Sequence, residues 1–150
     1  DWLKVVAGRQ NLLLTPRILD WAGVAAWKNA HRILTERGTR ARVLSAAFRN
    51  HLQLSELVGG DLVISPPFEW QQKIDAAGLE LPSRIDAPVD EAILAELHAA
   101  LPEFTRAYEP YGLTHEEFAE FGATRATLRQ FLVADEQLDA LVREVLVPAP

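Results

Sequence analysis

The spacing of apolar residues changes its period along this chain. In the first half, three short continuous apolar runs predict buried strands, over residues 11–15, 43–47 and 61–65. Helical spacing follows each run, over residues 24–37, 52–58 and 66–77. We expect glycines to end these helices: Gly38, the pair Gly59 and Gly60, and Gly78. The resulting β-α-β-α-β-α order predicts a parallel sheet covered by helices.

Beyond Gly78 the pattern contains no strand signal. Residues 79–89 read as a proline-containing linker, and residues 90–101 as an amphipathic helix. Thr114 and Glu117 have the spacing of a capping box that opens a short helix. We expect Gly122 to break that helix, Thr124 to cap a long final helix, and Pro148 and Pro150 to end it. The apolar stripe of the final helix comprises Leu128, Phe131, Leu132, Leu138, Leu141, Val142 and Val145.

Length and composition narrow the possible classes. The chain has 150 residues, of which 49% are hydrophobic, and this suits one globular domain. No apolar run approaches the ~20 residues that span a bilayer, and no secretory signal is visible, so we expect no membrane partner. Without cysteine there are no disulfides or thiolate metal sites, and the histidines have no metal-ligand spacing. The chain lacks methionine and starts abruptly near a strand, so we expect that an N-terminal part is missing.

The net charge of −6 is unevenly distributed. Residues 1–79 carry ten Lys and Arg against seven Asp and Glu, giving +3, whereas residues 80–150 carry five against fourteen, giving −9. The acidic half argues against nucleic acid as a partner. The mildly basic half is where an anionic small molecule would be attracted. A plain alternative is that the acidic half is a solvated helical surface.

Arg17 and Arg49 are the leading candidates for binding such an anion. Each follows a predicted strand and precedes a predicted helix, the place where α/β proteins hold anionic ligands. A guanidinium group offers a planar set of donors that matches phosphate oxygens. The sequence therefore predicts a two-arginine phosphate clamp. The alternative is that each arginine pairs with a carboxylate such as Asp20 or Asp61.

Three motifs around these arginines resemble a known family. "RILDW" (17–21), "AAFRN" (46–50) and "GGDLVISP" (59–66) resemble, in order, the C-terminal third of transaldolases, which reads GRILDW, ASFRN and AGCD(L/F)LTISP. The resemblance covers roughly residues 11–75 well and the helical remainder more loosely. It implies that the three βα units are strands six to eight of a TIM (β/α)8 barrel, followed by C-terminal α-helices. Residues 1–79 and residues 80–150, the linker and the helices packed on the barrel, would then form one domain.

The resemblance also implies a function. Transaldolases belong to the pentose phosphate pathway and transfer a dihydroxyacetone unit between sugar phosphates of the fructose 6-phosphate, erythrose 4-phosphate and sedoheptulose 7-phosphate class, without a cofactor or metal. We accordingly expect a cytoplasmic protein in which Arg17 and Arg49 hold the substrate phosphate. The Schiff-base lysine of the family lies on a strand upstream of this chain. No catalytic residue is therefore expected here, and the isolated chain should be inactive.

The chain departs from the family pattern at several positions. The family serine that contacts phosphate is Ala47 here, and Ser45, on the same face of the predicted strand, is the candidate substitute. Phe48, between Ala47 and Arg49, either lines the ligand pocket or belongs to the core. Pro16 replaces a glycine. Lys28 and Lys73 lie on predicted helices and are expected to be solvated surface residues.

Two other functional classes remain open. One is a non-catalytic sugar-phosphate-binding module that lacks the lysine strand altogether. The other is a helical protein-interaction module, in which residues 90–147 make the contacts and the βα part is a scaffold.

Overall fold

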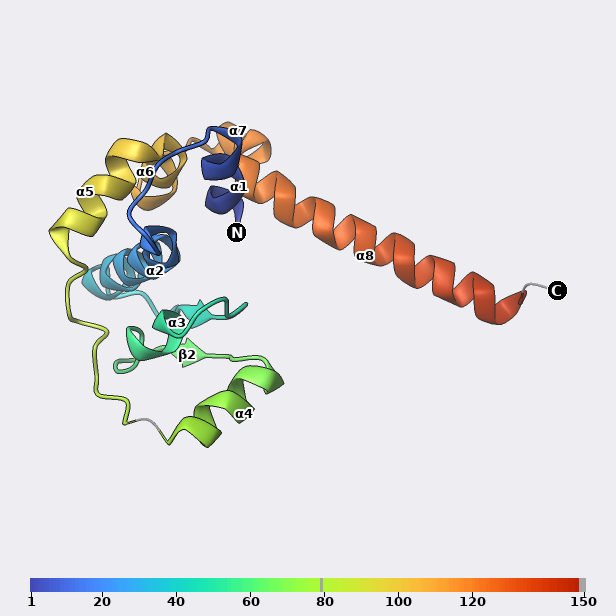
Figure 1. The fold of residues 1–150 in the computed structure, drawn as a ribbon, viewed down its shortest axis with the longest axis horizontal. Coiled ribbons are helices and arrows are strands. Elements are labelled where there is room, and N and C mark those ends of the chain that lie inside the picture. The colour runs from blue at the N-terminus through green and yellow to red at the C-terminus, as the bar shows by residue number, and fades with distance from the viewer. Residues whose placement is uncertain (79, 149–150) are drawn as a thin grey trace.

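The computed structural model describes residues 1–78 and 80–148, and 61% of it is helical (Figure 1). This part of the chain forms eight helices and two short strands. In chain order they are α1 (Trp2–Arg9), α2 (Ile18–Glu36), β1 (Leu44–Ser45), α3 (Leu52–Ser55), β2 (Val63–Ile64), α4 (Phe68–Ala77), α5 (Glu91–Ala100), α6 (Pro102–Tyr108), α7 (His115–Glu120) and α8 (Gly122–Leu146).

The two strands form a small parallel pair joined through α3. Leu44 lies opposite Val63, and Ser45 lies opposite Ile64. The backbone N–H of Val63 donates to the carbonyl of Val43 at 3.0 Å, and that of Ser65 donates to the carbonyl of Ser45 at 2.8 Å. One βαβ crossover is therefore present, with strands much shorter than the sequence predicted.

The prediction of three βα units from a TIM barrel is wrong, because the fold is α-rich with two short parallel strands. The apolar run before Arg17 forms an extended segment rather than a strand. The N–H of Leu12 donates to the carbonyl of Ala7 at 3.1 Å, and the N–H of Thr15 donates to the Glu96 carboxylate at 2.7 Å. The side chain of Leu13 is fully exposed. An apolar run becomes a parallel strand only where neighbouring strands exchange hydrogen bonds with it, and here α1 and α5 supply the partners instead.

Helix ends were predicted better than helix starts. Gly38 and Gly78 adopt left-handed conformations, with φ of 60° and 55°; Gly78 directly follows α4, and Gly38 lies two residues beyond the end of α2, as expected. The helix expected to run to Gly59 ends earlier, because α3 stops at Ser55. The capping box is confirmed, because Thr114 Oγ1 accepts from the N–H of Glu117 at 3.3 Å while the Glu117 carboxylate accepts from the N–H of Thr114 at 2.9 Å. In contrast, α2 begins at Ile18 instead of residue 24, α8 begins at Gly122 instead of after Thr124, and α1 and α6 were not predicted.

The core consists of two clusters that share α2. The larger cluster joins α1, α2, α5 and α6, and its most buried members are Ile18, Ala22, Ala25, Leu97, Leu101 and Phe104. The smaller cluster joins α2 to α3 and the following segments through Val24, Leu52, Leu57 and Ile85. Residues from both halves of the sequence therefore pack against one central helix.

Lys28 of α2 is buried, so the expectation that it lies on a solvated surface is wrong. Its side chain is 8% exposed, and its Nζ donates to Glu56 Oε2 at 3.1 Å and to the carbonyls of Arg84 and Ala87 at 2.9 and 2.8 Å. Arg84 Nε also donates to Glu56 Oε1 at 2.7 Å. These bonds tie the linker after Gly78 to α2 and α3, which covers the polar side of α2 at this position.

The long helix α8 projects away from the rest of the molecule (Figure 1). Its 25 residues span about 37 Å at 1.5 Å per residue, and its main contacts are with α7 and α1 near its N-terminal end. Gly122 lies against the indole ring of Trp2, leaving no room for a Cβ atom. No described residue of α8 is buried. Within residues 1–78 and 80–148, no helix is both long and apolar enough to cross a membrane.

Candidate anion-binding site

Arg17 and Arg49 both lie at tight turns of the backbone. Arg17 itself has a left-handed conformation, with φ of 66°, at the N-cap position of α2. Ala47, with φ of 54°, turns the chain between β1 and Arg49. A left-handed conformation costs a residue with a Cβ atom roughly 1–2 kcal/mol. The fold therefore holds two strained turns, one at each candidate arginine.

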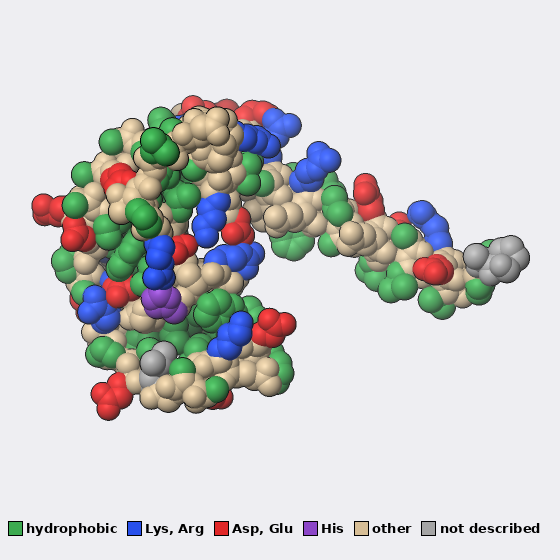
Figure 2. Space-filling view, viewed as in Figure 1, with side chains coloured by type: hydrophobic (Ala, Val, Ile, Leu, Met, Phe, Trp, Pro, Cys, Tyr) green, Lys and Arg blue, Asp and Glu red, His purple; other side chains and the backbone are tan. Residues whose placement is uncertain are grey.

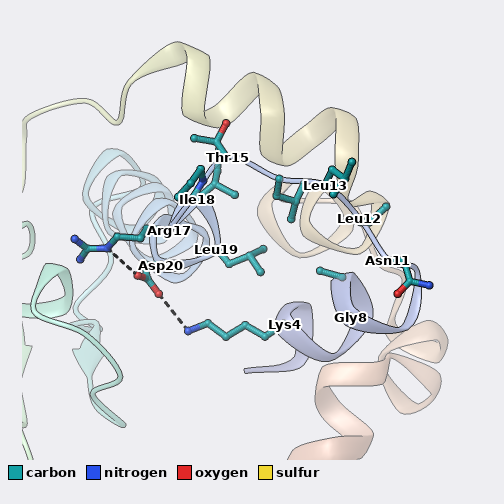
Figure 3. A pocket seen from close by; sticks show the side chains of 13 residues that line it. Lys4, Gly8, Asn11, Leu12, Leu13, Thr15, Arg17, Ile18, Leu19 and Asp20 are labelled. Atoms are coloured by element: carbon teal, nitrogen blue, oxygen red, sulfur yellow. Dashed lines mark hydrogen bonds and ion pairs between the residues drawn. The ribbon is translucent and has the colours of Figure 1, made fainter.

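The Asp20 carboxylate joins two cations from different helices (Figure 3). Arg17 Nε lies 3.5 Å from Asp20 Oδ2, and Lys4 Nζ of α1 lies 3.2 Å from Asp20 Oδ1. The carboxylate is largely covered, while the Arg17 and Lys4 side chains are at least half exposed. The Asp20 carboxylate thus lies between the positive charges of Arg17 and Lys4, and both of these side chains remain accessible to solvent.

Arg49 lies beside this group but is anchored separately. Its Nε lies 2.7 Å from Asp1 Oδ2, and its Nη1 donates to the carbonyls of Ala47 and Phe48 at 3.3 and 3.1 Å. The next residue, Asn50, donates from Nδ2 to the backbone carbonyl of Asp20 at 3.5 Å. The loop that carries Arg49 therefore contacts the first turn of α2, and Arg17 is the N-cap residue directly before that turn.

A groove of about 680 Å³ runs along this region. It is lined by Lys4, Arg17, Asp20 and the extended segment Leu12–Thr15 (Figure 3). Arg49 is not among its lining residues. The structure thus brings Arg17 and Lys4 together at one groove and places Arg49 on the adjoining loop. Sequence analysis missed Lys4, because α1 carries no capping or motif signal.

The alternative hypothesis, that Arg17 and Arg49 pair with carboxylates such as Asp20 or Asp61, is confirmed for one of these two carboxylates. Arg17 pairs with Asp20, as that alternative proposed. Asp61 instead forms an ion pair with Arg42, with 3.4 Å between Asp61 Oδ1 and Arg42 Nη1. Arg49 forms its ion pair with Asp1. These are ion pairs between partly exposed groups, which are typically worth about 0–1 kcal/mol. Such pairs are weak enough for a multivalent anion to replace.

The other candidate residues lie in different environments. Ser45 is buried on β1, and its backbone carbonyl accepts from Ser65, whereas Ala47 is exposed beyond the end of the strand. Phe48 is 3% exposed and its ring lies 6.0 Å from that of Trp70, between centroids. The pocket-lining role of Ser45, Ala47 and Phe48 stays a prediction. Among the residues that the structure describes, no group of three or more His, Cys, Asp or Glu side chains could hold a metal ion.

No protein-family model matches the chain, and no solved structure matches it. The likeness to transaldolases therefore rests on the three motifs around Arg17, Arg49 and residues 59–66.

Proposed function

We propose that this chain supplies the phosphate-binding segment of a cytoplasmic, transaldolase-like enzyme that transfers a dihydroxyacetone unit between sugar phosphates. The Schiff-base lysine would come from sequence upstream of Asp1. The observation that carries the proposal is the contact between the two motif turns. Asp20 binds Arg17 and Lys4 through its carboxylate and Asn50, the neighbour of Arg49, through its backbone carbonyl.

The chemistry of phosphate suits this arrangement. A sugar phosphate carries close to two negative charges and three terminal oxygens, so it can accept from several cations at once. Each charge-assisted hydrogen bond contributes roughly 1.5–3 kcal/mol, more than the surface ion pair that it would replace. Arg17 and Arg49 would give planar donor pairs, and Lys4 a point charge.

Calorimetric titration of the chain with fructose 6-phosphate tests the proposal. We expect binding of fructose 6-phosphate but not of fructose, and Arg17→Ala or Arg49→Ala should each weaken binding by roughly 10-fold or more, the equivalent of one such hydrogen bond. Arg42→Ala is the matched control, because Arg42 is an equally exposed arginine paired with Asp61. Unchanged affinity in both test variants would refute the phosphate role.

The catalytic part of the proposal needs the full-length protein. Borohydride reduction in the presence of fructose 6-phosphate should trap a covalent adduct on an upstream lysine. The isolated chain should give no adduct, because the proposal places the reactive lysine upstream of Asp1. If no adduct forms on the full-length protein, the Schiff-base enzyme is excluded, and the non-catalytic sugar-phosphate-binding module and the helical interaction module are left.

A second candidate function is the helical interaction module. The exposed apolar stripe of α8 favours it, because a lone amphipathic helix gains most of its stability by burying that stripe. It predicts association that survives Arg17→Ala and Arg49→Ala unchanged.

A further inference from the structure

The charged side chains of the candidate site alternate in sign. The Asp20 carboxylate lies between Arg17 and Lys4. Arg49 pairs with Asp1, the N-cap residue of α1, the helix that carries Lys4. Figure 2 shows Lys and Arg side chains, with carboxylates among them, around the hollow at the centre of this view. These three cations and two carboxylates leave an excess of one positive charge, and Arg49 is the member that a loop carries.

The position of the Arg49 guanidinium group depends on the backbone of its own loop. Its Nη1 donates to the carbonyls of Ala47 and Phe48, the two residues before it. The Phe48 side chain is buried, whereas the Arg49 side chain is 52% exposed. A half-exposed arginine can adopt many rotamers, and bonds to its own loop restrict where its charge lies. A group that fixes this loop therefore also fixes the charge of Arg49.

Gln53 of α3 holds the loop at Arg49 itself. Its Oε1 accepts from the backbone N–H of Arg49 and from that of Asn50, the latter at 3.2 Å. Asn50 Oδ1 in turn accepts from the N–H of Leu52 at 3.0 Å. This exchange between Asn50 and the first residues of α3 resembles the reciprocal bonding of a capping box. Because hydrogen bonds are directional, one oxygen that accepts from two consecutive N–H groups restricts the backbone between them.

The helix that carries Gln53 is itself anchored in the core. Leu52 belongs to the same buried cluster as Val24 of α2. Glu56, at the end of α3, accepts from the buried Lys28 at 3.1 Å. A side chain on an element that is fixed in this way places its contacts more precisely than one on a free loop. Gln53 therefore links the loop of Arg49 to the packing of α3 on α2.

We propose that Gln53 is a positioning residue for phosphate binding, because it holds the loop in which the Arg49 guanidinium is ready to meet the phosphate. This inference rests on the sugar-phosphate proposal for the site. Gln53 does not touch the substrate: its amide oxygen sets the backbone, and the backbone sets the guanidinium. Such pre-organisation lowers the ordering cost of binding. A glutamine that only stabilises α3 would make the same hydrogen bonds, so affinity and stability must be measured separately.

Gln53→Met removes the acceptor and keeps a side chain of similar size. Calorimetric titration should show that it weakens binding of fructose 6-phosphate roughly 3- to 10-fold, the equivalent of one hydrogen bond. Gln53→Asn, which is one methylene too short to reach both N–H groups, should have the same effect. Gln71→Met is the matched control and should leave the affinity unchanged, because Gln71 Nε2 bonds the backbone carbonyl of Pro66 at the start of α4 instead. Unchanged affinity in the Gln53 variants, or an equal loss in the control, would overturn the proposal.

A double-mutant cycle separates positioning from a merely structural role. If Gln53 acts through Arg49, Gln53→Met should not weaken binding further in a protein that already carries Arg49→Ala. Additive losses would overturn this inference alone and leave the phosphate role of Arg49 in place. A wild-type chain that binds no fructose 6-phosphate would refute the phosphate site itself, and this inference with it.

Amide hydrogen exchange gives a readout that needs no ligand. The N–H groups of Arg49 and Asn50 should exchange several-fold faster in Gln53→Met, because they lose their acceptor. The N–H groups of Ser55 and Glu56, which donate to carbonyls within the turn of α3, should be unchanged. Equal acceleration at all four amides would mean that Gln53 stabilises α3 as a whole, and would overturn the positioning role.

Discussion

Replacing Lys28 with Met should destabilise the protein strongly. The substitution keeps an apolar stem of similar length but removes the ammonium group that donates to Glu56 and to the carbonyls of Arg84 and Ala87. Both Lys28 and Glu56 have side chains less than a tenth exposed, so water cannot readily replace the lost donor.

The expected loss in the free energy of unfolding is about 3 kcal/mol. Breaking one partner from a buried ion pair typically costs about 3–5 kcal/mol, because the other charge remains buried. The low end applies here, since Arg84 still donates to Glu56 at 2.7 Å. A loss of this size is a large share of the roughly 5–15 kcal/mol that stabilises a typical domain.

Urea unfolding of both forms at neutral pH measures this difference. With a dependence on urea of roughly 1–3 kcal/mol per molar, the midpoint should fall by about 1–3 M. Lys73→Met is the matched control, because the Lys73 ammonium lies over the Trp70 ring at 5.2 Å, on α4, which has no buried residue. It should cost no more than about 1 kcal/mol.

An equal, small loss in both variants would refute the reasoning. It would mean that the Lys28 ammonium is solvated and that the linker is not tied to α2 through it. A large loss in Lys28→Met alone would support the buried network.

Acid should weaken the network of Lys28, Glu56 and Arg84, and single substitutions should test two backbone turns and one helix cap. Burial alone would raise the pKa of Glu56, but hydrogen bonds and charge from Arg84 and Lys28 outweigh it and lower the pKa. Its contribution to stability is therefore full above its unfolded pKa of about 4.3 and is lost as pH falls through the lower folded value, which urea unfolding against pH would show. Ala47→Gly should raise the melting temperature by relieving the left-handed turn, a gain of up to about 1 kcal/mol. Gly59→Ala should cost more than about 2 kcal/mol in urea, because φ is 106° and the new Cβ would overlap the Ser83 hydroxyl. Thr114→Ala should cost about 1 kcal/mol through loss of the capping box, seen as a lower urea midpoint.

Local signals in the sequence predicted local structure well. The glycines after α2 and α4 and the capping box at Thr114 depend on the geometry of a few neighbouring residues, and the structure confirms them. The strand prediction for residues 11–15 depended on distant partners, which a single apolar run cannot specify. The partners turned out to be Ala7 and Glu96, on helices.

In the candidate site, too, local sequence signals and contacts between distant segments must be distinguished. Motif spacing led to the prediction that Arg17 and Arg49 bind phosphate, and this role stays a prediction. The structure places the two turns in contact through Asn50 and the Asp20 carbonyl, but only Arg17 lines the groove. Motif spacing did not identify Lys4, which reaches Asp20 only because α1 folds back against α2. Nor did it show that Lys28 is buried, since a helical position reveals its exposure only when the covering segment is known.

The orientation of α8 relative to the rest of the molecule depends on the contact between Gly122 and the indole ring of Trp2. A rotation of about 10° at this contact would carry the far end of a 37 Å helix through about 6 Å, so small changes in packing at the indole ring are amplified at the tip. In a variant with Trp21, Trp27 and Trp70 replaced by Phe, the emission of Trp2 would report changes in this packing without any added label.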